Sequence, residues 1–188
     1  MDTLASTGEV GVSHWVVWWV TLVLVLAAVI DGLKLKVPNW ITFPFILSGW
    51  AYSAYVGGWE GLGVSLFGTA VGLALLLPAY SIGGMGAGDV KLLAGFGAWM
   101  YSTHTCWTFA FSAVVGAVLA VLMVLWHKAF RKHATQFLSI LNEIMTIRDP
   151  GQLAQIAADR KPSMMLLPYG IPIAIGAVTY FAWSGMLV

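Results

Sequence analysis

The chain has 188 residues, of which 60% are hydrophobic and 9% are charged, with a formal net charge of +1. Soluble domains carry roughly 25% charged residues, so this composition excludes an ordinary soluble domain and predicts an integral membrane protein. A single cysteine, Cys106, excludes an intramolecular disulfide and a multi-cysteine zinc site. The histidines show no ligand spacing, and we expect no metal, no cofactor and no nucleic-acid partner.

Apolar segments predict about six membrane spans of roughly 20 residues, joined by short loops. The first ten residues contain Asp2 and Glu9 but no basic residue, so the first segment is predicted to be a retained span rather than a signal peptide. The uncharged stretch 92–127 is too long for one span, and we divide it at residues 101–104 into a short fourth and a longer fifth span. Residues 1–188 then form one all-α membrane domain. The predicted spans are 10–30, 37–59, 61–82, the two parts of 92–127, and 166–188.

The basic residues predict how these spans are oriented. With six spans and an outside N-terminus, every Lys and Arg falls on the cytoplasmic side, as the positive-inside rule requires. A five-span arrangement would place basic residues on both sides of the membrane. We therefore expect a multi-pass membrane protein whose N-terminus lies outside. The basic residues are at positions 34, 36, 91, 128, 131, 132, 148, 160 and 161.

The longest loop, residues 128–163, is predicted to be cytoplasmic and amphipathic. Apolar residues recur at helical spacing between positions 137 and 145, and Asp149-Pro150-Gly151 ends the pattern. With basic residues just upstream, this helix is expected to lie along the anionic inner leaflet. A part in gripping the substrate is the alternative.

Two aspartates stand at the ends of apolar segments. Asp31 ends the first segment, and Asp89 stands at the start of the fourth. A carboxylate is costly at a membrane, so such residues are functional candidates. Each also has a structural interpretation, because Asp31-Gly32 is a common turn pair and Asp89 can cap a helix start. The predicted topology places both at the cytoplasmic face.

Two carboxylates on one membrane face are what peptide hydrolysis by an aspartic protease needs. One must be ionised, to take a proton from water, while the other is protonated, to donate to the scissile carbonyl or the leaving amine. Like charges about 3 Å apart do not both ionise, so such a pair holds a single proton. The sequence leaves open which aspartate is the base and whether the pair is assembled without substrate.

Glycines surround the second aspartate. Gly83, Gly84, Gly86 and Gly88 permit close backbone approach to an extended substrate, and they tolerate irregular backbone beside a wet cavity. The spacing Gly68-x-x-x-Gly72 instead favours close packing between helices.

Three motifs together resemble the type IV prepilin peptidase family. Asp31 followed by 37–40, Val-Pro-Asn-Trp, resembles the D-x5-[IV]-P-N motif of that family. Residues 86–91, Gly-Ala-Gly-Asp-Val-Lys, resemble its G-x-G-D-x-K motif. Residues 168–176 are similar to the P-[FY]-G-x-x-x-A-x-G segment of its last span. The three motifs occur in family order.

The resemblance implies a G-x-G-D aspartic protease fold in the bacterial inner membrane that cleaves the leader peptide of prepilins or pseudopilins at the cytoplasmic face. Asp31 and Asp89 would be the catalytic pair. Gly86 and Gly88 would shape the site, and Pro38, Asn39 and Lys91 would support it. Pro168 and Gly170 would allow the last span to flex near the pair.

The chain also departs from the larger members of the family. Those bifunctional proteins carry a four-cysteine, zinc-binding insertion between their first two spans, whereas here only six residues separate Ile30 from Val37. The resemblance is therefore to the short form found with tight-adherence pili, and we expect no N-methyltransferase activity. Presenilin-type proteases share G-x-G-D, but their Tyr-Asp and Pro-Ala-Leu motifs are absent from this sequence.

Two functions of other classes remain open. Intramembrane carboxylates also mark proton- or ion-coupled transporters, although a relay needs them near the bilayer midplane rather than at span ends. A non-catalytic assembly factor could retain the fold, although both aspartates and their motifs are intact. The oligomeric state and the particular pilin are not encoded in any pattern of the sequence.

Overall fold

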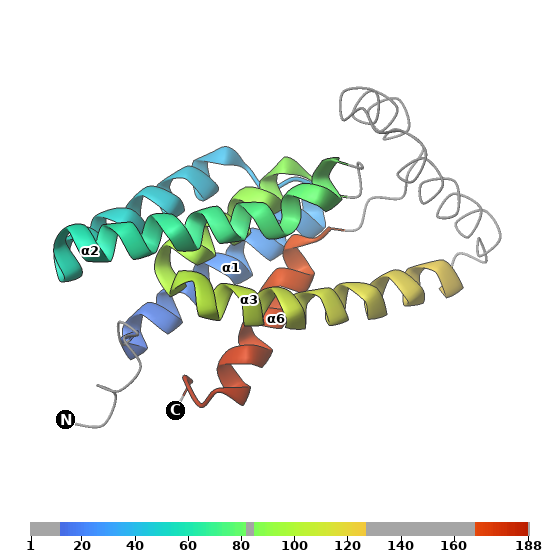
Figure 1. Cartoon of the computed structure of the whole chain (residues 1–188). Helices are drawn as coiled ribbons and strands as arrows, with labels where there is room; N and C mark the ends of the chain where they lie inside the picture. Colours follow the sequence, from blue (N-terminus) through green and yellow to red (C-terminus); the bar gives the residue numbers. More distant parts are fainter. Residues whose placement is uncertain (1–11, 82–84, 127–167, 188) are drawn as a thin grey trace.

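The computed structural model describes residues 12–81, 85–126 and 168–187, and every regular element in these ranges is a helix (Figure 1). The helices are α1 (His14–Lys34), α2 (Asn39–Ser81), α3 (Ala87–Trp126) and α6 (Gly170–Trp183). The predicted amphipathic helix of the 128–163 loop lies outside the described residues. The all-α prediction is confirmed for the part of the chain that the structure covers.

Two of the long helices are each a pair of helices joined at one non-helical residue. In α2 this residue is Gly58, with φ 58° and ψ −144°, and in α3 it is Tyr101, with φ 60° and ψ −179°. Figure 1 shows the chain reversing direction within both α2 and α3. The break in α3 lies at the first residue of the segment where the sequence analysis divides the uncharged stretch.

Helix bounds differ from the predicted spans mainly at their ends. The first span was expected to stop at Ile30, but α1 continues through Asp31 to Lys34. The last span was expected over residues 166–188, whereas α6 covers only Gly170–Trp183. The first difference matters for function, because it places Asp31 inside the last turn of a helix rather than in a turn after it.

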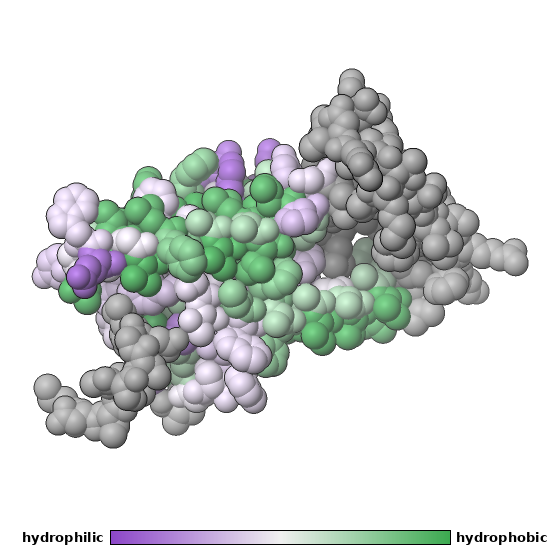
Figure 2. All heavy atoms as spheres, viewed as in Figure 1, coloured by the Kyte–Doolittle hydropathy of each residue, from purple (hydrophilic) through white to green (hydrophobic). Residues whose placement is uncertain are grey.

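Three of the helices, α1, α2 and α3, are long and apolar enough to cross a membrane, and α6 is a shorter apolar helix. Many large hydrophobic side chains are exposed on their outer faces, among them Leu22, Phe67 and Val118. Figure 2 shows hydrophobic residues covering much of the visible face of α2 and α3, with the strongly hydrophilic ones at its margins. The fold therefore fits a membrane protein, whereas the count of six crossings remains a prediction.

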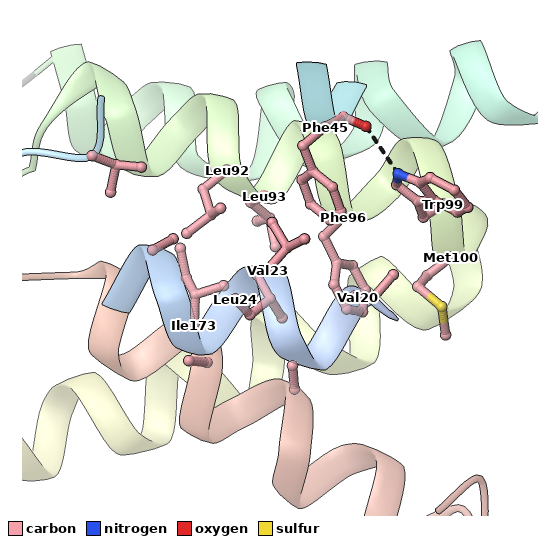
Figure 3. Packing of buried hydrophobic residues seen from close by; sticks show 14 of the residues in the cluster. Val20, Val23, Leu24, Phe45, Leu92, Leu93, Phe96, Trp99, Met100 and Ile173 are labelled. Carbon is pink, nitrogen blue, oxygen red and sulfur yellow. Dashed lines mark hydrogen bonds between the residues drawn. The ribbon is translucent and has the colours of Figure 1, made fainter. Parts of the chain in front are cut away.

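The core lies where the first part of α3 meets α1, α2 and α6. Residues 92–100 are all buried, so this part of α3 contacts protein on every side. In Figure 3, Leu24 of α1 and Ile173 of α6 lie in the same cluster as residues of α3. The ring of Phe96 stacks on Phe181 of α6 with a centroid distance of 5.9 Å. A helix that is hydrophobic all round is expected in such a central position.

Glycines bring α2 into backbone contact with α3. A Cβ atom on Gly68 would overlap the carbonyl oxygen of Gly97, and one on Gly97 would overlap that of Gly68. One turn further along α2, a Cβ on Gly72 would lie 2.5 Å from the carbonyl oxygen of Leu93. The predicted packing role of Gly68-x-x-x-Gly72 is confirmed, and this contact fixes the position of the first part of α3.

A substitution at Gly97 tests this contact. We expect Gly97→Ala to lower the free energy of unfolding by about 1–3 kcal/mol, the usual cost of overpacking a core. The matched control is Gly63→Ala, because Gly63 has nothing within 4 Å of its Cβ position. The unfolding temperature of both variants is measured in detergent. Equal unfolding temperatures would contradict the close contact between Gly68 and Gly97.

Candidate active site

The two aspartates lie on different helices and are both buried. Asp31 is on the last turn of α1 and 2% exposed, and Asp89 is in the first turn of α3 and 4% exposed. The predicted position of Asp89 at a helix start is confirmed. The two side chains line the same cavity, so the fold brings together carboxylates that are distant in the sequence.

The first residue of α6 joins the pair. The backbone N–H of Gly170 donates to Oδ2 of Asp31 at 2.8 Å, across 139 positions of sequence. A Cβ on Gly170 would lie 2.9 Å from Oδ2 of Asp31, so only glycine lets the backbone come this close. A main-chain donor at the start of α6 thus holds the carboxylate at the end of α1.

The two oxygens of Asp89 have different surroundings. Its Oδ2 accepts a hydrogen bond of 3.1 Å from the backbone N–H of Gly86, which closes the first turn of the G-x-G-D segment. Its Oδ1 is buried and has no hydrogen-bond partner among the described residues. Because Asp89 lines the same cavity as Asp31, this oxygen can accept a hydrogen bond from a further group.

A cavity of about 390 Å³ opens beside the pair. Gly83 and Gly84 lie outside the described residues, and the other predicted site residues all line it except Pro38 and Gly170. Gly170 instead bonds Asp31, and the carbonyl of Pro38 accepts a hydrogen bond of 3.1 Å from the N–H of Ile41 at the start of α2. The lining residues are Asp31, Leu35, Lys36, Val37, Asn39, Gly86, Ala87, Gly88, Asp89, Lys91 and Pro168.

The chain between α1 and α2 is folded tightly against the start of α3. Leu35 adopts the left-handed conformation, with φ 51°, and its N–H donates to the carbonyl of Asp31 at 2.7 Å. This conformation costs a non-glycine residue about 1–2 kcal/mol, and such strain gathers at functional sites. Beyond it, Val37 packs on Gly88, where a Cβ would lie 2.7 Å from the Val37 carbonyl oxygen. The first and second aspartate motifs are therefore in direct contact.

The Lys91 side chain links α3 to the start of α2 at the edge of the cavity. Its Nζ donates to Oδ1 of Asn39 at 3.0 Å. It also lies 4.7 Å from the centroid of the Phe43 ring, which is cation–π distance. Asn39 and Phe43 are four residues apart, so they share one face of the helix. A lysine held from two sides presents its charge at a fixed place.

Sequence reasoning missed three residues of this region: Leu35, Lys36 and Phe43. The i, i+4 spacing from Asn39 would have pointed to Phe43, and Lys36 directly precedes the Val-Pro-Asn segment. Leu35 gave no signal, because a leucine is not expected at positive φ. Within the described residues, no cluster of His, Cys, Asp and Glu could hold a metal ion.

Taken together, the fold and the cavity define a helical membrane protein with a buried carboxylate pair at one end of its helices. The sequence model of the type IV leader peptidase family matches residues 18–121, more than half of the chain. The chain belongs to the type IV leader peptidase family. The matched region contains both aspartates and ends before α6.

Curated relatives agree with this assignment. The chain is 32% identical over 112 residues to proteins named prepilin leader peptidase/N-methyltransferase from Aeromonas salmonicida and Aeromonas hydrophila. The alignment covers 56% of this chain and 38% of each of these relatives, so the chain spans well under half of their length. No solved structure matches the chain.

Substitution of Gly170 tests the link between α6 and the carboxylates. We expect Gly170→Ala to lower peptidase activity by about 10- to 100-fold, because a hydrogen bond to a charged group contributes about 1.5–3 kcal/mol. The rate of prepilin cleavage by the Gly170→Ala variant is compared with the rate for Gly63→Ala, a helix substitution remote from the cavity. Activity within twofold of the wild type would contradict a role for this amide.

Proposed function

We propose that this protein is a membrane aspartic endopeptidase that removes the leader peptide of type IV prepilins or pseudopilins. Asp31 and Asp89 are the catalytic pair in this proposal. The observation that carries it is the meeting of two buried carboxylates from α1 and α3 in one cavity, where the Gly170 amide donates to Asp31. Membership of the leader peptidase family supplies the class of substrate.

The proposed chemistry follows from one proton shared by the pair. Two interacting carboxylates that are both withheld from water hold a single proton between them. The ionised aspartate takes a proton from a water molecule, whose oxygen then attacks the scissile carbonyl carbon. The protonated aspartate donates to the carbonyl oxygen, and the leaving nitrogen gains a proton as the C–N bond breaks. The unpaired Oδ1 of Asp89 is an acceptor for such a water.

The walls of the cavity suit an extended peptide. Gly86 and Gly88 present backbone without side chains beside Asp89, and a substrate chain must lie extended to be cut. Gly88 also packs on Val37, so its lack of a side chain serves both the fold and the access of a substrate.

The charge distribution supports a cytoplasmic site. Lys34 follows Asp31 by three residues, and Lys36 and Lys91 line the cavity. By the positive-inside rule this end of the helices faces the cytoplasm. With the breaks at Gly58 and Tyr101 as turns between spans, the described helices are compatible with the six-span arrangement in the inner membrane and an outside N-terminus.

The relatives are named for two activities, leader peptidase and N-methyltransferase. We propose only the peptidase activity for this chain. The sequence has one cysteine and no C-x-x-C pair, and α1 and α2 are joined by only the short segment 35–38. We therefore expect no N-methylation of the cleaved pilin. The carboxylates lie at helix ends, which favours hydrolysis over a proton relay near the bilayer midplane.

The catalytic pair is tested by co-expression with a candidate prepilin. We expect Asp31→Asn and Asp89→Asn each to abolish the mobility shift of leader cleavage, because asparagine keeps the shape of the side chain but does not share the proton. Protein level and membrane insertion should match the wild type. Substantial cleavage by either variant would end the two-aspartate proposal.

Lys91 offers a second test. We expect Lys91→Met to lower kcat/KM by about tenfold, the equivalent of about 1–2 kcal/mol for one hydrogen bond and one cation–π contact. Lys91→Arg retains both kinds of contact and should recover most of the loss. Lys34→Met is the control, since Lys34 is exposed and does not line the cavity. Equal kcat/KM for Lys91→Met and Lys34→Met would exclude a positioning role.

A further inference from the structure

The start of α6 rests on the second part of α3, at Gly116. A Cβ on Gly116 would lie 3.0 Å from Cε2 of the Tyr169 ring and 3.4 Å from its hydroxyl oxygen. Tyr169 directly precedes Gly170, whose N–H donates to Asp31. The missing side chain of Gly116 thus leaves room for an aromatic ring beside the very group that bonds the carboxylate.

The break at Tyr101 explains why Gly116 lies at this end of the molecule. Asp89 is about 18 Å along the first part of α3 from Tyr101, and Gly116 is about 22 Å along the second part, at 1.5 Å per residue. Because the chain reverses direction between the two parts (Figure 1), both positions return to the same end. One helix pair therefore carries both a carboxylate of the site and the contact surface for Tyr169.

The rest of α6 follows the same face of α3. A Cβ on Gly176 would overlap Ser112, one turn before Gly116. Near the opposite end of α6, a hydrogen bond of 2.6 Å joins Nδ1 of His104 to the Tyr180 hydroxyl. The buried residues between positions 102 and 120 recur every three or four positions, as expected for one face of a helix. They are Thr105, Thr108, Ser112 and Gly116.

We propose that Tyr169 is a positioning residue of the active site, whose ring, seated on Gly116, sets the place of the Gly170 amide against Asp31. The proposal rests on the proposed peptidase function. Tyr169 does not line the catalytic cavity, so it acts through Gly170 rather than on the substrate. The hydrogen bond from Gly170 is 2.8 Å long, and a shift of the amide by about 1 Å would take it beyond hydrogen-bond range.

A purely structural role for Tyr169 makes a different prediction. Its side chain also packs against the hydrophobic core, so a smaller residue could simply lower the amount of folded enzyme. That loss would leave the pH–rate profile in place. A hydrogen bond donated to a carboxylate favours its ionised form, so a displaced Gly170 amide should move the profile to higher pH, whichever aspartate is the base.

Two substitutions of Tyr169 separate these roles, with a prepilin as substrate in liposomes. We expect Tyr169→Ala to lower kcat by about tenfold, to leave KM within twofold, and to move the pH–rate profile upward by up to about one unit. Tyr169→Phe keeps the ring and should match the wild type in all three measurements. An unmoved profile for Tyr169→Ala, or a loss confined to KM, would overturn the proposal.

The other side of the contact is tested at Gly116. Gly116→Leu should displace the ring and lower kcat as Tyr169→Ala does, whereas Ala117→Leu, at the next and exposed position of α3, should not. The double variant Gly116→Leu, Tyr169→Ala should lose no more than Tyr169→Ala alone, because the leucine then has no ring to displace. Multiplied losses in the double variant would contradict the contact.

Failure of this inference is distinct from failure of the proposed function. If the wild type cleaves no prepilin, the peptidase proposal fails. If the wild type cleaves and Tyr169→Ala cleaves equally well, only the positioning role falls. Should Gly116→Leu not fold, the comparison of Tyr169→Ala with Tyr169→Phe decides alone.

Discussion

The hydrogen bond from the Gly170 amide to Asp31 is the contact on which the arrangement of the site depends. It joins the beginning of α6 to the end of α1 across 139 positions of sequence, and Asp89 at the start of α3 lines the same cavity as Asp31. Three helix ends therefore meet at the site. The N-terminal end of a helix carries unpaired N–H groups and a partial positive charge, so it is suited to stabilise carboxylates nearby.

The rest of the fold keeps those helix ends in place. The first part of α3 is enclosed by protein, and glycines bring α2 against it at backbone distance. The Trp99 indole N–H donates to the Phe45 carbonyl at 2.9 Å and adds a directional link between the same two helices (Figure 3). On the other side, Phe96 stacks on Phe181 of α6. Asp89 thus lies at the start of a helix segment that the other described helices enclose.

Much of the site could be predicted from the sequence, because its chemistry is carried by residue types that are costly in a membrane. Asp31 and Asp89 were identified as a pair from their positions at span ends, and the short connection 35–38 forces α2 to begin near Asp31. The division of α3 near Tyr101 followed from the length of the uncharged stretch 92–127, which is too long for one span. The role of Gly68 followed from its spacing to Gly72, since few residues other than glycine allow two helices to touch.

Other features depend on tertiary contacts that no local pattern encodes. The left-handed Leu35 contradicts the preference of its residue type and is held by the surrounding structure. The donor to Asp31 is the backbone amide of Gly170, so the identity of the side chain at position 170 does not reveal it. The contact between α1 and α6 joins two helices distant in sequence, and the sequence of each indicates only an apolar span.

The complete burial of residues 92–100 has a consequence for how this segment tolerates change. Ordinary membrane helices face lipid on at least one side, so substitutions there are governed by the transfer of a side chain into hydrocarbon. Here the neighbours are other side chains and backbone, packed as densely as in the interior of a soluble protein. Tolerance along this segment should therefore follow side-chain volume rather than hydrophobicity, and a hydropathy profile would misjudge which replacements the protein accepts.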